Sequence, residues 1–222
     1  MSLRPRTVHT QHRGLVQTVA PEFKPVTPEE LRTHLNHSEL DYIEADDLIS
    51  EASQYIEDMT GIAMITQTWR LALDAWPTGR GAWWDGVRQG SINELYSGDA
   101  SLEMPRFPLN SIDTVTVYDE ASTSTAVTIA ATFDVDAYSK PGRMTLKHGA
   151  VWPIALRANN AIEIIFTCGY GANRESVPAP LRRAVKQLAG YLYENRGDCD
   201  SGSAYTKSGA QGIMNAYKVS RL

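Results

Sequence analysis

The chain has 222 residues, of which 42% are hydrophobic and 21% charged, and its formal net charge is −5. The length fits one or two domains, and the apolar content is too high for a chain that is disordered by composition. The acidic balance argues against a general nucleic-acid coat, which would be basic.

Residues 1–24 are expected to form an N-terminal arm. Arg4, Arg6 and Arg13 are its basic residues, no acid appears before Glu22, and prolines interrupt any regular element. Two interpretations of this segment stay open. It is either a frayed terminus or an arm that becomes ordered against a partner or a neighbouring subunit.

Residues 25–61 are expected to form the first part of a helical body. Thr27 and Glu30 match a capping box around Pro28, and the short helix that they start is expected to end near Leu35. Such a cap satisfies backbone N–H groups that would otherwise lack partners in the first turn.

A long acidic helix is predicted next, with Ser38 as its N-cap and Gly61 as the residue that closes it. Between residues 39 and 58 it carries many acids and no Lys or Arg, and a solvated face is the plain interpretation of this pattern. A catalytic carboxylate would need a pocket that raises its pKa. The apolar residues recur every three or four positions and must be buried by a later part of the chain: Ala45, Leu48, Ile49, Ala52, Ile56 and Met59.

Residues 62–176 are expected to form an inserted β-domain. From Ile65 to Leu73 the hydrophobic period is two, which is typical of a half-buried strand. The links between the strand candidates are too short for helical crossovers, which favours antiparallel pairing. Glycines and Pro77 indicate a long loop near 77–101. The further strand candidates are 112–118, 133–135, 143–146 and 161–167.

Residues 177–197 are expected to form the second part of the helical body. Val177-Pro178-Ala179-Pro180 restarts a helix, and Asn195-Arg196-Gly197 ends it. Its apolar face is expected to pack against that of the acidic helix: Leu181, Ala184, Val185, Leu188 and Leu192. The predicted fold class is α+β, with a small helical bundle, an inserted antiparallel β-domain and an extended C-terminal tail.

Residues 198–222 are expected to form a flexible linker and a short amphipathic peptide. The linker, residues 198–212, is rich in Gly and Ser and has too little apolar surface to fold alone. Apolar and basic residues then cluster at the end of the chain: Ile213, Met214, Tyr217, Lys218, Val219, Arg221 and Leu222.

The sequence offers little catalytic chemistry. It contains no nucleophile elbow, P-loop or zincin motif. The pairs His9/His12 and His34/His37 lack a third ligand, so surface histidines are the better interpretation. Cys168 opens a glycine-rich segment without dinucleotide-binding spacing, which is interpreted as a turn that ends a strand. We therefore expect no enzyme, no cofactor and no metal site.

Two further observations bear on location and on an alternative function. Two cysteines in a chain this long indicate reduced cytosolic thiols, and no apolar run reaches the length of a membrane span. The alternative function is a nucleic-acid-binding module, in which the basic arm contacts phosphates and Trp83 and Trp84 stack on bases. The other interpretation of these tryptophans is that they fold back onto the domain.

The motifs resemble, in their order and spacing, the head–tail connector or adaptor proteins of long-tailed bacteriophages and gene transfer agents. The resemblance covers about residues 25–197 and is weaker in the C-terminal peptide. It gives no role to the arm or to the 77–101 loop, where this sequence departs from the family pattern. The matching segments are Tyr55–Gly61, Ile65–Leu71, Pro105–Leu109, Pro141–Arg143, Cys168–Gly171, Val177–Leu181 and Tyr193–Arg196.

The resemblance implies a structural protein of the virion, located at the head–tail interface and synthesised in the host cytoplasm. It implies a homo-oligomeric ring, expected to be a dodecamer, that binds the portal on one side and a tail-side stopper or tail terminator protein on the other. DNA would pass through the ring without sequence-specific binding, and no membrane contact is expected.

The resemblance also suggests two groups of site residues. The C-terminal peptide is expected to bind the portal through Ile213, Met214, Tyr217, Lys218, Val219, Arg221 and Leu222. The acidic helix is expected to line the channel or the subunit interface through Asp41, Glu44, Asp46, Asp47 and Glu51. Acids that face a channel would repel DNA phosphates and keep the duplex from binding to its wall.

Overall fold

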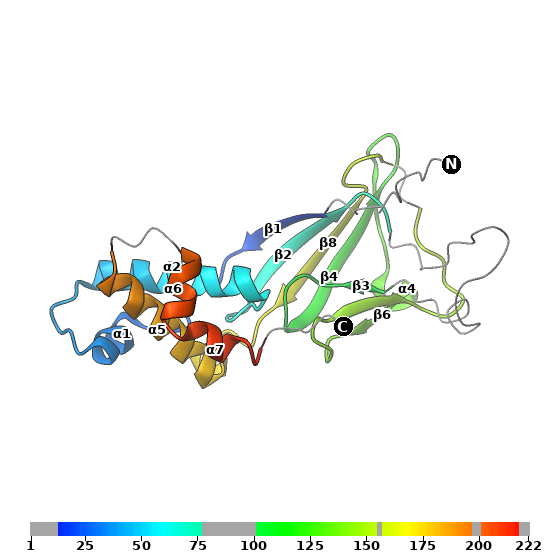
Figure 1. The fold of residues 1–222 in the computed structure, drawn as a ribbon. Helices are drawn as coiled ribbons and strands as arrows, with labels where there is room; N and C mark the ends of the chain where they lie inside the picture. Colours follow the sequence, from blue (N-terminus) through cyan, green and yellow to red (C-terminus); the bar gives the residue numbers. More distant parts are fainter. Residues whose placement is uncertain (1–12, 77–100, 155–156, 197–200, 218–222) are drawn as a thin grey trace, which may run out of the picture.

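The computed structural model describes residues 13–76, 101–154, 157–196 and 201–217. These residues form an elongated molecule with helices gathered at one end and β-sheets at the other (Figure 1). Buried apolar residues form two clusters, one among the helices and one among the strands. The two clusters meet near residues 62–65 and 107–109, so each half of the molecule has its own core.

The predicted capping box at the first helix is confirmed. The Thr27 side chain accepts a hydrogen bond from the Glu30 N–H, and the Glu30 carboxylate accepts one from the Thr27 N–H. The described residues of the helical end form α1 (Pro28–Leu35), α2 (Tyr42–Thr60), α5 (Ala179–Glu194), α6 (Ser201–Lys207) and α7 (Ala210–Met214).

The start of the acidic helix α2 differs from the prediction. Ser38 is not the N-cap; the Asp41 carboxylate accepts a hydrogen bond from the Ile43 N–H instead. Leu40 is buried in the helical core directly before this cap, which sets where the chain turns into the helix. Gly61 closes α2 in the left-handed conformation with φ 76°, as predicted.

Helices α2 and α5 pack against each other through their apolar faces, as predicted. Leu48 and Leu192 are only partly buried against this core, and Met59 is exposed at the end of α2. The fully buried residues of the two faces are Ala45, Ile49, Ala52 and Ile56 of α2, with Leu181, Ala184, Val185 and Leu188 of α5.

The sheet end contains two antiparallel sheets, and every strand predicted from the sequence is present with small changes of bounds. The larger sheet has the order β1 (Arg13–Val19), β2 (Gln67–Leu73), β8 (Ile162–Cys168), β4 (Leu109–Tyr118) and β5 (Ser124–Ala126). The smaller sheet has the order β3 (Leu102–Glu103), β7 (Arg143–Leu146) and β6 (Phe133–Asp136). Short helices α4 (Ile129–Thr132) and η1 (Arg174–Ser176) complete the described fold.

The prediction that residues 1–24 contain no regular element is wrong for β1. Residues 13–19 pair antiparallel with β2, with Leu15 opposite Leu71. The prolines that suggested an irregular arm lie on either side of this run and leave its backbone N–H groups free to join the sheet. Residues 1–12 lie outside the described residues.

The prediction of a flexible linker is wrong for residues 201–212, which form α6 and most of α7. Tyr205 is buried and its ring centroid lies 5.5 Å from that of Tyr55 on α2. Ala204 and Ala210 are also buried in the helical core. The small residues of this segment let two short helices pack closely on α5, so a polar composition does not prevent folding here.

Candidate functional site

The acids predicted to face a channel or an interface occupy different environments on α2. Asp41 caps the helix. Glu44 lies 2.7 Å from a guanidinium nitrogen of Arg196, and Asp46 lies 2.5 Å from the ammonium of Lys24. Glu44 and Asp46 therefore already neutralise cations of their own chain, which leaves them less available to a partner.

Asp47 and Glu51 are exposed, and neither has an ion-pair partner among the described residues. Their spacing of four residues places them on one face of α2, together with the exposed Ile43 and Gln54. We call these four residues the acidic face. It points away from α5, because it lies opposite the buried residues through which α2 packs.

A group of positive charges that the sequence alone did not indicate lies on the outer side of the same bundle. Arg183 is exposed on α5, Lys186 follows one turn later, and His34 of α1 is their neighbour. Partial burial and the charges of Lys186 and Arg183 lower the pKa of His34, so these groups are close in space. We call these three residues the basic face. The spacing of Arg183 and Lys186 could have indicated a helix face, but the contribution of α1 depends on the fold.

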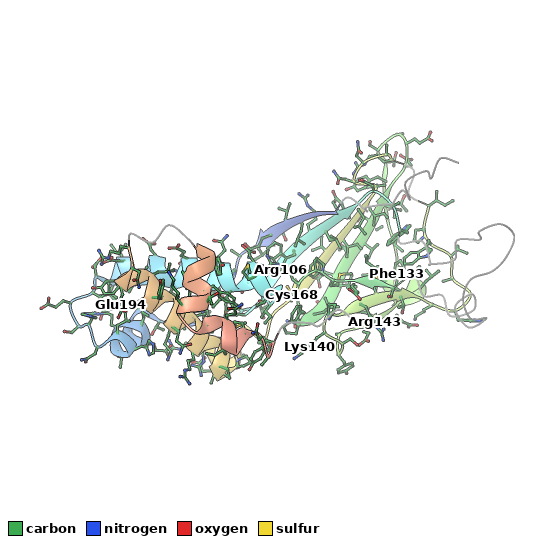
Figure 2. All side chains as sticks on the ribbon, in the orientation of Figure 1. Arg106, Phe133, Lys140, Arg143, Cys168 and Glu194 are labelled. Carbon is green, nitrogen blue, oxygen red and sulfur yellow. The ribbon has the colours of Figure 1, made fainter. Side chains whose placement is uncertain are left out.

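A buried polar cluster joins the two halves of the molecule, and its Arg106 lies between the helical end and the sheet end (Figure 2). The Glu57 carboxylate accepts hydrogen bonds from the Met64 N–H at 2.7 Å and from the Gln67 amide at 3.1 Å. Burial raises the pKa of Glu57, and these two hydrogen bonds oppose the shift. Both carboxylate oxygens are thus committed to holding the end of α2 onto the start of β2, which is a structural role.

Arg106 completes this cluster from the other side. Its guanidinium donates to the backbone carbonyl of Glu57 at 2.5 Å and to the Asp58 carboxylate at 2.6 Å. The same group lies 4.6 Å from the centre of the Trp69 ring. A cation at the carboxyl end of a helix also interacts favourably with the helix dipole. Arg106 therefore connects α2, β2 and the segment before β4.

The other residues that were considered for catalysis or metal binding pack against neighbouring side chains and have structural roles. Cys168 is buried, and this burial raises the pKa of its thiol to about 12, which removes the thiolate that a nucleophile needs. The ring of His37 packs against Tyr193 with centroids 5.6 Å apart. Within the described ranges, no group of three His, Cys, Asp or Glu residues is arranged to hold a metal ion. His9 and His12 lie outside those ranges.

A surface groove of about 510 Å³ lies between α2 and the segments around residues 22–28 and 173–175. Four of its five charged residues are paired, Lys24 with Asp46 and Arg174 with Glu175, and the fifth is Glu22. It therefore contains no cluster of free catalytic groups. None of the helices in the described part of the chain is long and apolar enough to cross a membrane.

Solved structures of a gene transfer agent particle match nearly the whole chain. A chain in the neck of the empty particle, computed with C6 symmetry, is 25% identical, with a TM-score of 0.69 over 94% of this chain and 97% of that chain. This chain has the fold of a gene transfer agent neck protein. Chains in the native virion and in the native neck computed with C12 symmetry are each 22% identical over 94% of this chain. Their TM-scores are 0.70 and 0.67, and the match covers 96% and 97% of those chains.

The neck-protein fold confirms the resemblance to head–tail connectors and the predicted α+β class. Neither a scan against protein families nor a search of curated proteins finds a match. The structural similarity therefore carries the comparison, and it extends over both the helical and the sheet ends of the neck-protein fold.

The described part of the predicted portal-binding peptide packs into the helical core. Met214 is 0% exposed in the helical core, and Ile213 and Tyr217 pack partly buried against it. The prediction that these three residues belong to a free peptide is therefore wrong. Ile213 and Met214 end α7, Tyr217 follows it, and the aromatic ring of Tyr205 on α6 shares the same core.

Residues 218–222, which include Lys218, Val219, Arg221 and Leu222, lie outside the described residues. So do Arg4, Arg6, Trp83 and Trp84, on which the nucleic-acid alternative depends.

Proposed function

We propose that this chain is a structural component of the neck of a phage-like particle, located at the head–tail interface of the virion. The observation that carries this proposal is the match, over 94% of the chain, to chains in neck and virion structures of a gene transfer agent. Such a chain acts by binding neighbours and has no reaction to catalyse. No nucleophile, metal cluster or free catalytic group among the described residues competes with this assignment.

We further propose that copies of the chain form a closed ring of twelve that continues the portal channel. The matched necks were computed with C6 and C12 symmetry, which supports a repeated arrangement of subunits around an axis. Ring closure by head-to-tail contacts buries subunit faces without leaving a free end. DNA passes through the opening without sequence-specific contact, and a stopper or tail terminator protein binds on the tail side.

Portal contact is proposed at the helical end of the molecule. Lys218, Val219, Arg221 and Leu222 stay candidates, because they directly follow the part of α7 that packs in the core. Lys218 and Arg221 would bind carboxylates or backbone carbonyls of the portal. Anchoring of the preceding residues in the body limits how far these four can reach.

The test is a deletion of the gene from the genome that encodes the particle, followed by electron microscopy of the products. Filled heads without tails are expected, and supplying the chain in trans should restore tailed particles. Labelling the chain should place density between head and tail in the restored particles. Normal tailed particles from the deletion strain would exclude the neck function.

A further inference from the structure

Two outward faces of the helical end contain charged side chains of opposite sign that have no ion-pair partner among the described residues. The acidic face on α2 contains Asp47 and Glu51 without intramolecular ion-pair partners. The basic face contains Arg183 and Lys186 of α5, which also lack ion-pair partners among the described residues. Each face therefore has charge available for a partner, and the partner of each must have the opposite sign.

The two faces point in different directions. Helices α2 and α5 pack together through Ile49, Ile56, Val185, Leu188 and neighbouring apolar residues. The acidic face lies on the side of α2 opposite its buried residues. Arg183 lies on the side of α5 that faces away from α2, on one helical stripe with Gly190, on which Leu35 of α1 packs. One copy can therefore present its acidic face to the basic face of a second copy, while its own basic face stays open to a third.

We propose that the acidic face of one subunit binds the basic face of the next, so that alternating charge determines the order of subunits around the ring. The interface proposal rests on the ring of the proposed function and identifies the surfaces that close it. A contact between two different faces is heterologous, which generates rings when the rotation closes. Contact of like faces is disfavoured, because acids would meet acids and bases would meet bases.

Apolar area supplements the charges at this contact. Ile43 begins the acidic face and is 73% exposed, although it is a large aliphatic side chain on a regular helix. Burial of such a side chain against the neighbouring subunit removes apolar surface from water. The ion pairs then determine which faces meet, and the apolar contact adds affinity that salt does not screen.

Charge reversal tests the assignment on the purified full chain. The double variants Asp47→Lys/Glu51→Lys and Arg183→Glu/Lys186→Glu should each raise the protein concentration needed for half-assembly at least about tenfold, measured by mass photometry. The control Glu103→Lys/Glu120→Lys reverses two exposed acids at the sheet end and should leave assembly unchanged. Circular dichroism melts establish that each variant is folded.

A mixing experiment provides the sharper result. The first double variant has two basic faces and the second has two acidic faces, so neither should assemble alone. An equimolar mixture should form rings in which the two variants alternate, and native mass spectrometry should find equal numbers of each. Assembly of either variant alone at the wild-type concentration, or failure of the mixture to assemble, overturns the interface assignment.

Different results would contradict the proposed ring and the proposed interface. A wild-type chain that stays monomeric at every concentration contradicts the ring itself. A wild-type ring that both reversals leave intact keeps the proposed function and excludes only these faces as its interface. In that case Arg183 and Lys186 would be free to bind another anionic partner such as DNA. Binding of a DNA duplex by the wild-type protein that weakens as salt is added would detect this partner.

Discussion

Glu57 is a largely buried carboxylate whose titration contributes to the pH dependence of stability. Burial raises its pKa, so the folded chain keeps the Glu57 proton to a higher pH than the unfolded chain does. The unfolded state then binds fewer protons, and stability falls as pH rises from about 4, the ordinary range of a glutamate, towards the raised pKa.

We expect Glu57→Gln to remove this titration while keeping an acceptor for the Met64 N–H. The variant should gain stability relative to the wild type as the pH increases from about 4 to 7. Urea unfolding at several pH values measures the difference. Glu51→Gln, on the exposed side of the same helix, is the control and should show no comparable trend. If the free energies of unfolding of the wild type and of Glu57→Gln differ by the same amount at every pH in this range, burial of Glu57 does not have the role given to it.

Gly169 is required by the close approach of two backbone segments. Its φ is +134°, and an added Cβ would lie 2.6 Å from the Ile65 carbonyl oxygen and the Thr66 nitrogen. Backbone atoms cannot rotate away as a side chain can, so Gly169→Ala should lower the free energy of unfolding by at least about 2 kcal/mol. Gly149→Ala is the matched control, since its φ is +80° with open space around it. If thermal unfolding shows that the two variants lose the same amount of stability, the backbone atoms close to Gly169 contribute nothing to the loss.

At the scale of elements, the contact between α2 and α5 is the centre of the helical core. Leu188 is 1% exposed there. Leu188→Ala should cost roughly 2–5 kcal/mol, because it removes buried methyl groups and leaves a cavity. Chemical denaturation measures the loss, and the partly buried Leu192 should cost less on the same substitution. A loss well below about 1 kcal/mol at position 188 would contradict this packing.

The packing of the C-terminal segment in the helical core can also be tested by mutation. Met214 is buried in the core, so Met214→Ala should destabilise the chain by roughly 2–5 kcal/mol. Deletion of residues 213–222 should likewise lower stability, although the sequence alone predicts a free peptide there. Asn215→Ala, at the exposed neighbouring position, should have little effect on the thermal midpoint. A truncated chain with unchanged stability would restore the interpretation of a separate peptide.

The elements that the sequence predicted well carry their own local signals. The capping box of α1, the glycine that ends α2 and the alternation in β2 all depend on residues close together in the chain. Among the elements that were missed, β1, α6 and α7 are short and depend on distant partners. Tyr205 folds against Tyr55 across a sequence separation that local patterns do not encode. Tertiary packing therefore decided their structure.

For the candidate surfaces too, features that depend on neighbouring residues could be predicted, and those that depend on tertiary contacts could not. The acids of α2 were visible as a run without basic residues, but their ion pairs were not. Arg196 reaches Glu44 and Lys24 reaches Asp46 only in the folded bundle. Half of the proposed interface also escaped notice, since His34 joins the charges of α5 from another helix.

In the molecule as a whole, the two hydrophobic cores meet near residues 62–65 and 107–109, and we call this region the joint. Arg106 is 8% exposed there and touches both halves. Backbone hydrogen bonds from the Ala63 N–H to the Phe107 carbonyl and from the Phe107 N–H to the Gly61 carbonyl lie beside it. Removal of Arg106 should therefore loosen the joint before it affects either core.

We expect Arg106→Ala to increase hydrogen exchange at the amides of Ala63 and Phe107, measured by NMR. The amide of Leu188, deep in the helical core, should stay protected to nearly the wild-type level. The Lys147→Ala variant, which removes a cation that pairs with Asp134 at the sheet end, serves as the comparison. A uniform rise at all three amides would indicate global destabilisation and would count against a local joint.

The position of β1 has a consequence for handling the protein. Among the described strands, none pairs with the outer side of β1. Such an edge offers backbone donors and acceptors to a strand of another chain, and charges or prolines within a strand normally discourage this. Arg13 is the only charge in β1, which contains no proline. Chains made in excess of their assembly partners are therefore prone to aggregate edge to edge, and any assembly that covers β1 also keeps the protein in solution.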